Sequence, residues 1–297
     1  MCGRFASTQT DADLVRAFRA EEVVGEQLAP SYNVAPTQPV RAVLERTPCE
    51  ESEAPPIRQI RTARWGLIPS WAKDRRIGSR LINARAETIT EKPSFKAAAS
   101  RRRCIVPANG YFEWERRDGA KVPHYLHGDG VLGMAGLYEL WPDPEREPDD
   151  PQRWVWTITV LTTTASDALG HIHDRSPVVI PPALQDAWLD HTLTDSERVR
   201  ELLDSVPEPR LRPYEVSTAV NSVRNNSAGA ATPGVAGRPD HARPRYGDLL
   251  VVVRRSTNNA GGRNKMLLIR LSHHLDTRSL NVVGLAVDEC DTPKGIS

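Results

Sequence analysis

The second residue of the chain, Cys2, has a clear potential for covalent chemistry. If the initiator methionine is removed, Cys2 becomes the first residue and carries a free α-amine beside its thiol. Reference pKa values of about 8 for the amine and about 8.5 for the thiol make both usable nucleophiles near neutral pH. The amine forms an imine with an aldehyde, and the thiol adds to the imine to close a five-membered thiazolidine. The alternative is a small buried hydrophobe, which is the commoner fate of a cysteine.

Three further residues could support this chemistry at Cys2. Asn83 offers an amide that can hold the α-amine by hydrogen bonds without charging it. Glu113 stands between two aromatic residues, and apolar burial there would raise its pKa towards neutrality and suit it to general acid-base catalysis. His173 titrates near physiological pH and can move protons on and off oxygen. Each has an ordinary structural explanation alone, but together with Cys2 they predict an active site.

Arginine and tryptophan residues accompany these candidates. Arg4, Arg85 and Arg175 each lie two residues from one of them, where a planar guanidinium could hold a backbone phosphate. Trp65 and Trp71 have flat faces on which bases can stack. The formal net charge is only +1, so the composition as a whole does not indicate a strongly basic nucleic-acid binder.

The elements that must position these residues are short. Apolar and β-branched runs predict strands at residues 40–44, 57–64, 104–115 with a break at 107–110, 123–127, 131–140, 154–163, 177–180 and 211–217. We expect residues 123–127 and 131–140 to form a hairpin. Apolar periodicity and capping residues predict helices at 10–19, from Pro93 onwards, at 182–189 and at 195–206. Many short strands without strict alternation predict an α+β fold, a single domain built on an antiparallel, barrel-like sheet with a few peripheral helices.

The composition excludes several other classes of protein. The four cysteines form no C-x-x-C pair, which argues against a zinc site or a disulfide framework. No apolar run reaches membrane-spanning length and no secretory signal is visible, so we expect a soluble, cytoplasmic protein with no metal and no cofactor. After about Asn226 the chain becomes rich in Gly, Ala, Pro and Arg. We therefore expect a domain at 1–226 and an extension of unassigned function at 227–297.

Four local motifs follow the Cys2 start in a fixed order. They are residues 33–38 (NVAPTQ), 64–69 with 83–88 (RWGLIP and NARAET), 109–114 (NGYFEW) and 170–177 (GHIHDRSP). From Cys2 to about Asn226, this series resembles the SRAP family, the SOS response-associated peptidases. The resemblance implies a covalent crosslink between the N-terminal cysteine and the ring-opened aldehyde of an abasic site in single-stranded DNA.

The resemblance also assigns roles to individual residues. It implies that the catalytic residues are Cys2, Asn83, Glu113 and His173. It implies DNA contacts by Arg4, Asn33, Trp65, Arg85, Thr162 and Arg175. We expect a monomer that acts on abasic single-stranded DNA in the cytoplasm, associated with the nucleoid when bound. Weak lyase activity through the imine and a peptidase activity that removes Met1 belong to the same expectation.

Two other functions remain open from the residues alone. An N-terminal-nucleophile hydrolase would use Cys2 to attack an amide, with its own amine as the base, and would turn over peptides without DNA. A non-covalent reader of modified or single-stranded DNA would use the same motifs as a recognition surface. Such a reader would bind intact and abasic oligonucleotides equally and would form no complex that survives denaturant.

Overall fold

The computed structural model describes residues 2–47, 55–165 and 167–232 of the 297-residue chain. The structural statements below concern these residues. The three apolar bursts expected in the extension after residue 246, together with Cys49 and Cys290, lie outside them.

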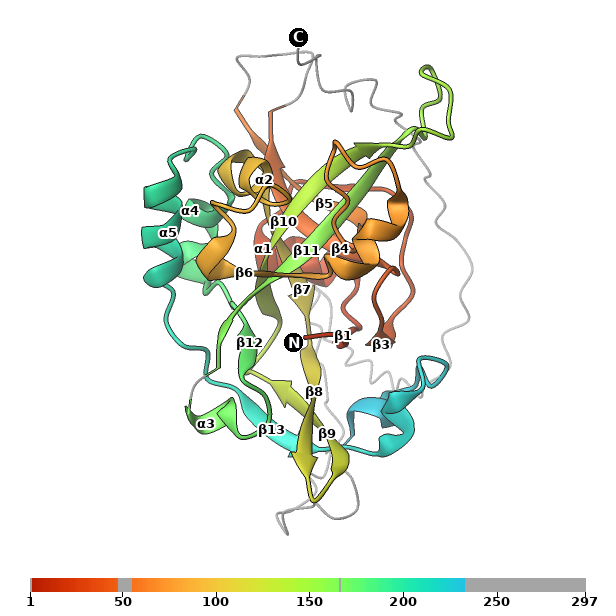
Figure 1. The fold of residues 1–297 in the computed structure, drawn as a ribbon, viewed down its shortest axis with the longest axis vertical. Helices are drawn as coiled ribbons and strands as arrows, with labels where there is room; N and C mark the ends of the chain where they lie inside the picture. Colours follow the sequence, from red (N-terminus) through yellow and green to blue (C-terminus); the bar gives the residue numbers. More distant parts are fainter. Residues whose placement is uncertain (1, 48–54, 166, 233–297) are drawn as a thin grey trace, which may run out of the picture. The chain divides into compact units, whose positions relative to one another are not determined.

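Five strands form a closed ring (Figure 1). In ring order they are β5 (Ile57–Trp65), β4 (Pro39–Arg46), β7 (Arg103–Ala108), β10 (Leu132–Pro142) and β11 (Trp154–Thr164). Neighbours in this order are antiparallel. A short parallel pairing of β11 with β5, through Thr157 opposite Arg64 and Ile158 opposite Trp65, closes the ring. Closure into a barrel removes the free edges that an open sheet would expose.

Three short strands extend the ring at β5 and β11. β2 (Glu22–Val24) runs parallel to β5, β6 (Asn83–Arg85) runs parallel to β11, and β12 (Arg175–Pro177) is antiparallel to β11. Both β6 and β12 therefore lie against the same strand. The sequence motifs around Asn83 and His173 are brought together by this arrangement, although they are far apart along the chain.

A second, antiparallel sheet carries the N-terminus. Its order is β13 (Arg212–Glu215), β9 (Ala120–His127), β8 (Gly110–Arg117), β1 (Phe5–Ser7) and β3 (Ser31–Val34). The chain passes from the ring into this sheet between β7 and β8, at Gly110. A Cβ atom on Gly110 would lie 2.5 Å from the carbonyl oxygen of Leu126, so only glycine permits this close approach. The crossing places β8 beside β1, and so places Glu113 beside the N-terminal segment.

The hairpin expected between residues 123–127 and 131–140 is wrong. β9 pairs with β8 and β13, whereas β10 pairs with β7 and β11, so the two segments belong to different sheets. The hairpin of the structure joins β8 to β9 through Asp118 and Gly119, whose φ angles are 52° and 80°. Two positive φ angles are the mark of a type I′ turn, for which Asp-Gly is a favoured dipeptide.

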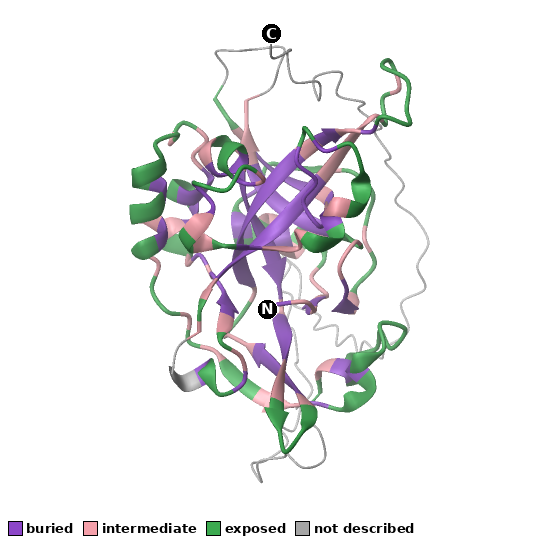
Figure 2. Ribbon diagram, in the orientation of Figure 1, coloured by how far each residue is buried: buried purple, intermediate pink, exposed green. Residues whose placement is uncertain are grey.

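Helices cover one side of the ring (Figure 2). They are α1 (Asp11–Phe18), α2 (Lys96–Arg101), α4 (Gln185–Leu189) and α5 (Ser196–Asp204). Thr10 caps the N-terminus of α1 through a capping box with Asp13, and the helix buries Leu14 and Phe18 in the core. The helices expected at 10–19, 182–189 and 195–206 are confirmed, while the one expected from Pro93 begins at Lys96. The mixed α+β architecture with a barrel-like antiparallel sheet is therefore as predicted.

Shorter helical turns complete the described chain. They are η1 (Arg75–Arg80), η2 (Ala86–Thr88), α3 (Asp167–Gly170), η3 (Pro182–Leu184), η4 (Thr218–Asn221) and η5 (Ala228–Ala231). η5 packs against the second sheet, since Ala230 is buried and the Tyr214 hydroxyl donates to the carbonyl of Ala231 at 2.6 Å. The described chain therefore continues to pack beyond residue 226, and the domain boundary stays a prediction. Within the described residues, no helix is both long enough and apolar enough to cross a membrane.

Candidate active site

Cys2 lies three residues before the start of β1 and is completely buried. The register of β1 on β8 places Phe5 opposite Tyr111, and the amide of Phe112 donates to the carbonyl of Arg4 at 2.9 Å. Burial, and secondarily the charge of Glu113, raises the pKa of the Cys2 thiol well above its usual range. The sulfur is therefore held as a thiol near neutral pH, with the Arg4 carbonyl 4.0 Å away as an acceptor.

Asn83 fastens this N-terminal segment to the ring. It is the first residue of β6, whose register sets Asn83 opposite Val160 of β11. Its Nδ2 donates to the carbonyl oxygen of Cys2 at 2.7 Å. Its Oδ1 is buried and accepts no hydrogen bond from the described residues. The amide thus holds Cys2 with one atom and keeps an acceptor with the other.

Glu113 lies in the middle of β8 with only 3% of its surface exposed. Burial raises the pKa of Glu113 from its ordinary 4.5 to about 7. Asp174 adds to the rise through charge repulsion. A carboxyl group with this pKa is divided between its acid and base forms at neutral pH, which is the condition for general acid-base catalysis.

His173 follows α3 and precedes β12. Burial lowers the pKa of His173 below its usual value. Its Nδ1 lies 2.9 Å from the amide nitrogen of Arg175 and 2.8 Å from a carboxylate oxygen of Asp174. The amide can donate only to an unprotonated Nδ1, whereas Asp174 pairs with that nitrogen only when it is protonated. The lowered pKa favours the first state at neutral pH, so the neutral ring carries its proton on Nε2.

A pocket of about 270 Å³ opens beside these groups, and its lining joins β6, β11 and the segment before β12. The lining residues are Asn83, Ala84, Arg85, Thr162, His173, Asp174 and Arg175. Two of the predicted catalytic residues and three of the predicted DNA contacts therefore share one pocket. Because Asn83 also donates to the main-chain carbonyl of Cys2, one residue of the pocket lining contacts Cys2 directly.

The two arginines of this pocket differ in their partners. Arg175 makes a two-point ion pair with Glu87, with both nitrogen–oxygen distances 2.8 Å, and also donates to the carbonyl of Thr162. The Arg85 side chain is exposed and forms no ion pair with any described residue. Arg85 is thus available to a phosphate, whereas Arg175 is held in place by Glu87. Glu87 lies inside the NARAET motif, but its role was not predicted from the sequence.

Arg4 is positioned from a different direction. Its Nη1 donates to Oδ1 of Asn33 at 2.7 Å and to the carbonyl of Val220 at 3.0 Å, and its guanidinium lies 5.8 Å from the ring centre of Trp114. Asn33 is buried, and its Nδ2 donates to three carbonyls in the 220–225 segment. With every polar atom of its side chain occupied, Asn33 positions Arg4. The expected contact of Asn33 with DNA stays a prediction, and the hydrogen bonds of its buried side chain do not favour a direct one.

Trp65 also differs from its expected role. It is completely buried, packs on Phe5 with ring centres 4.9 Å apart, and donates from Nε1 to the carbonyl of Ile82 at 2.8 Å. It has no face open to a base, so the expectation of stacking on Trp65 is wrong. Trp71 is 59% exposed and has the open face that stacking requires. Sequence alone could not separate the two, because both lie in one aromatic segment.

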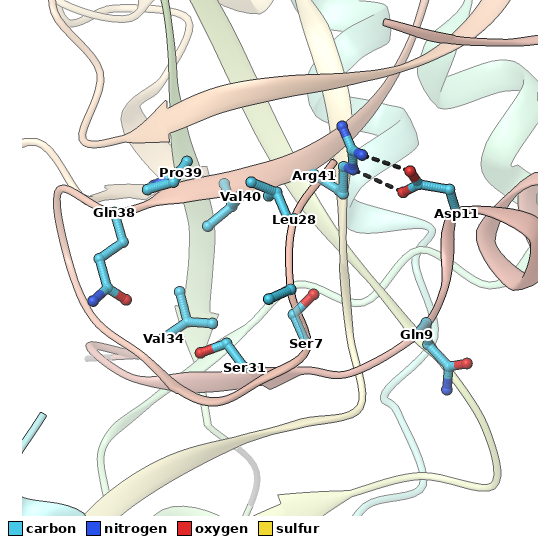
Figure 3. Close-up of a pocket in the computed structure, with 11 residues that line it drawn as sticks. Ser7, Gln9, Asp11, Leu28, Ser31, Val34, Gln38, Pro39, Val40 and Arg41 are labelled. Carbon is cyan, nitrogen blue, oxygen red and sulfur yellow. Dashed lines mark hydrogen bonds and ion pairs between the residues drawn. The ribbon is translucent and has the colours of Figure 1, made fainter. Parts of the chain in front are cut away.

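A second pocket, of about 250 Å³, lies between β1, β3 and β4 (Figure 3). It shares no lining residue with the pocket at Asn83. Its one basic side chain, Arg41, is buried and paired at two points with Asp11, with nitrogen–oxygen distances of 2.9 and 2.6 Å. Arg41 is therefore occupied within the fold. Among the described residues, no group of three or more His, Cys, Asp or Glu side chains could hold a metal ion.

The chain is similar to a described protein family and to several of its members. A family model described as SOS response associated peptidase (SRAP) matches residues 1–223. The abasic site processing protein YoqW of Bacillus subtilis is 38% identical over 231 residues, covering 76% of this chain and 97% of YoqW. HMCES of Gallus gallus, another abasic site processing protein, is 28% identical over 279 residues, covering 82% of this chain and 81% of HMCES.

Solved structures share the fold. A crystal structure of a Bacteroides thetaiotaomicron protein superposes with a TM-score of 0.65 at 24% identity, covering 79% of this chain and 100% of that protein. The matched residues 1–223 contain the ring, every strand of the second sheet and the residues Cys2, Asn83, Glu113 and His173. The chain belongs to the SRAP family.

Proposed function

We propose that this protein captures abasic sites in single-stranded DNA by forming a covalent bond through Cys2 after Met1 has been removed. The observation that carries the proposal is the grouping around Cys2. Asn83 binds its main chain at 2.7 Å, and the charge of a buried glutamate with a pKa of about 7 acts on its thiol. The relatives YoqW and HMCES are named as abasic site processing proteins, which supports DNA containing abasic sites as the substrate.

The first stage exposes the aldehyde and forms an imine. The deoxyribose ring opens when its C1′–O4′ bond breaks and the proton of the 1′-hydroxyl moves to O4′. Neutral His173 assists by donating a hydrogen bond from Nε2 to O4′, and it keeps its own proton. The Cys2 amine then attacks C1′ of the aldehyde, with one of its N–H groups donated to the buried Oδ1 of Asn83. The resulting carbinolamine loses water to give the protonated imine, and Glu113 in its acid form protonates the leaving hydroxyl.

The second stage closes the ring. The Cys2 sulfur adds to the imine carbon, and the electron pair of the C=N bond moves to nitrogen, which keeps its proton as an amine. The thiol proton passes to the Glu113 carboxylate left by the first stage. The net reaction joins one aldehyde and one aminothiol into a thiazolidine and releases one water. The same imine can undergo β-elimination, so a weak lyase activity is part of the proposal.

The DNA strand approaches through the pocket at Asn83. Arg85 at this pocket offers an exposed guanidinium to a phosphate, and Arg175 is oriented beside it by Glu87. Trp71 offers a stacking face for a base. Because arginines displace counterions from the phosphates, binding should weaken as salt rises. We expect the monomer to act in the cytoplasm, on single-stranded DNA of the nucleoid.

The deciding experiment is a crosslinking assay. The purified protein is incubated with an abasic single-stranded oligonucleotide and with the same oligonucleotide carrying an intact base, and heat-stable adducts are resolved on a denaturing gel. We expect an adduct only with the abasic strand, and mass spectrometry should locate it on Cys2 with Met1 absent. Cys2→Ala should abolish the adduct and retain non-covalent binding. An adduct on another side chain, or peptide turnover without DNA, would overturn the proposal.

A further inference from the structure

Two buried hydroxyl groups, those of Tyr111 and Ser176, have no part in the chemistry above. The Tyr111 hydroxyl and Oγ of Ser176 are 3.4 Å apart, and both residues are buried. Tyr111 belongs to β8 of the second sheet, whereas Ser176 belongs to β12, which is paired with the ring. The contact therefore bridges the two sheets. Cys2 and Tyr111 belong to the same buried cluster at this junction.

The strand register directs Tyr111 towards the reacting groups. Side chains two residues apart on a strand point to the same face, so Tyr111 and Glu113 share one face of β8. Charge on Glu113 acts on the Cys2 thiol, and charges on Cys2 and on Glu113 both act on the Tyr111 phenol. Tyr111 and Glu113 therefore share one face of β8, and both interact electrostatically with Cys2.

The hydrogen bonds fix which way the Tyr111 proton points. Oγ of Ser176 donates to the carbonyl of Pro177 at 3.3 Å, so towards Tyr111 it acts as an acceptor. The Tyr111 proton is directed to Ser176, and the phenolic oxygen keeps a lone pair that can accept from another donor. Burial raises the pKa of Tyr111, which keeps the hydroxyl neutral throughout the neutral pH range.

We propose that Tyr111 is a positioning residue for thiazolidine closure: its hydroxyl oxygen replaces the Arg4 carbonyl as the acceptor of the Cys2 S–H and so turns the sulfur towards the imine carbon. The inference rests on the proposed function, and it concerns only its second stage. Tyr111 neither gains nor loses a proton in that step. The S–C bond forms, the C=N electron pair moves to nitrogen, and the thiol proton goes to the Glu113 carboxylate. Ser176 acts through Tyr111, because it accepts the hydrogen bond that orients the Tyr111 hydroxyl.

The test separates imine formation from ring closure. Borohydride reduces an imine and fixes it as a stable amine, but it does not reduce a closed thiazolidine. In Tyr111→Phe, which keeps the ring and removes only the hydroxyl, we expect borohydride trapping at early times to proceed at the wild-type rate. The borohydride-independent adduct should form about tenfold more slowly, as expected for loss of one hydrogen bond to a reacting group. The imine should therefore accumulate.

A matched variant controls for a merely structural effect. Tyr125 is another buried tyrosine, on the neighbouring strand β9, and its ring packs on Phe112 with ring centres 4.9 Å apart, in a different apolar cluster from Cys2. Tyr125→Phe should leave the ratio of trapped imine to closed adduct unchanged. Ser176→Ala should raise that ratio in the same direction as Tyr111→Phe, because the phenol then loses the acceptor that orients it.

The outcomes distinguish this inference from the function on which it rests. If wild-type protein forms the adduct and both Tyr111→Phe and Ser176→Ala close the ring at the wild-type rate, the hydroxyl pair is structural and the inference is overturned. If the wild-type protein forms no adduct, the proposed function itself fails. Thermal melting of each variant shows whether it folds, and Ser176→Ala provides the test if Tyr111→Phe does not.

Discussion

The side-chain amide of Asn83 donates a hydrogen bond to the main-chain carbonyl of Cys2, across 2.7 Å and between residues 81 positions apart in the chain. The bond ties the N-terminal segment to β6, and thereby to β11 of the ring. Oδ1 of the same Asn83 amide is buried and accepts no hydrogen bond from any described residue. Asparagine alone among side chains of this size supplies both a donor and a neutral acceptor in this geometry.

Replacing Asn83 with aspartate should impair capture of the aldehyde. The carboxylate cannot donate to the Cys2 carbonyl, and its charge stabilises the protonated amine, which is not a nucleophile. We expect adduct formation at pH 7 to slow by about tenfold or more. The rate should recover partly at pH 9, where the amine loses its proton even beside a carboxylate. Single-turnover gel assays across this pH range measure the effect, and a flat, wild-type-like profile would contradict it.

The pH dependence of capture should carry the signature of Glu113. Protonating the leaving hydroxyl requires its acid form, which is lost as pH rises through about 7. We therefore expect the wild-type pH profile to bend downwards with a midpoint near 7, and the Glu113→Gln variant to lack that bend. The variant should also be slower by about a hundredfold, the usual contribution of a general acid. A rise that remains in the variant reports the α-amine, whose pKa is about 8.

Glu113→Gln should also stabilise the fold, and more so at high pH. The folded-state pKa of about 7 lies above the ordinary 4.5, so between these values the folded protein binds more protons than the unfolded chain. The free energy of unfolding of the wild type therefore falls as pH rises through this window. By pH 8 the loss reaches about 3 kcal/mol, which the glutamine variant does not suffer. Denaturant titrations at pH 4 and pH 8 should show a gap that opens only at pH 8.

Arg85 should contribute one phosphate contact to DNA binding. Its exposed guanidinium, without an ion-pair partner among the described residues, can replace one counterion on the strand. Arg85→Ala should lower the slope of log affinity against log salt by about 0.7. Lys121→Ala is the matched control, since it removes the same charge at the exposed start of β9. Fluorescence anisotropy with an intact single strand measures both, and equal slopes in the two variants would refute the contact.

We expect substitution of Trp71 to weaken DNA binding and substitution of Trp65 to lower the stability of the fold. Trp71→Ala removes an exposed ring, so the thermal midpoint should stay unchanged while affinity for single-stranded DNA falls by about tenfold. Trp65→Phe removes volume and one hydrogen bond from the buried junction of the two sheets. It should cost about 1–3 kcal/mol of folding free energy and leave the affinity of the folded protein unchanged. The reverse pattern would show that Trp65 reaches the DNA.

The sequence predicted local features better than spatial ones. The N-capped helix at Thr10 and most strands follow from short-range patterns, and so do the four candidates Cys2, Asn83, Glu113 and His173. The partner of each strand does not, because the choice between β8 and β10 as the neighbour of β9 depends on distant segments. The Asp118-Gly119 dipeptide was the available signal for that hairpin.

Burial was the other property that the sequence left undetermined. Trp65 and Trp71 lie in one aromatic segment of the sequence, yet Trp65 is buried in the core and Trp71 is exposed to solvent. Asn33 looks like a surface amide, yet it is enclosed by the 220–225 segment, which is nearly two hundred residues away along the chain. The ion pair of Glu87 with Arg175 could not be predicted for the same reason. Glu87 lies in η2, directly after β6, and Arg175 begins β12, and these two distant strands both pair with β11.

The enclosure of Cys2 has a consequence for oxidative damage. Peroxide attacks the thiolate form of cysteine, and access to the sulfur limits the reaction further. With the sulfur fully enclosed and its proton firmly retained, formation of sulfenic acid should be slow in the free protein. A Cys2 thiol that resists peroxide would stay able to react with an abasic site under the oxidative conditions in which DNA loses bases.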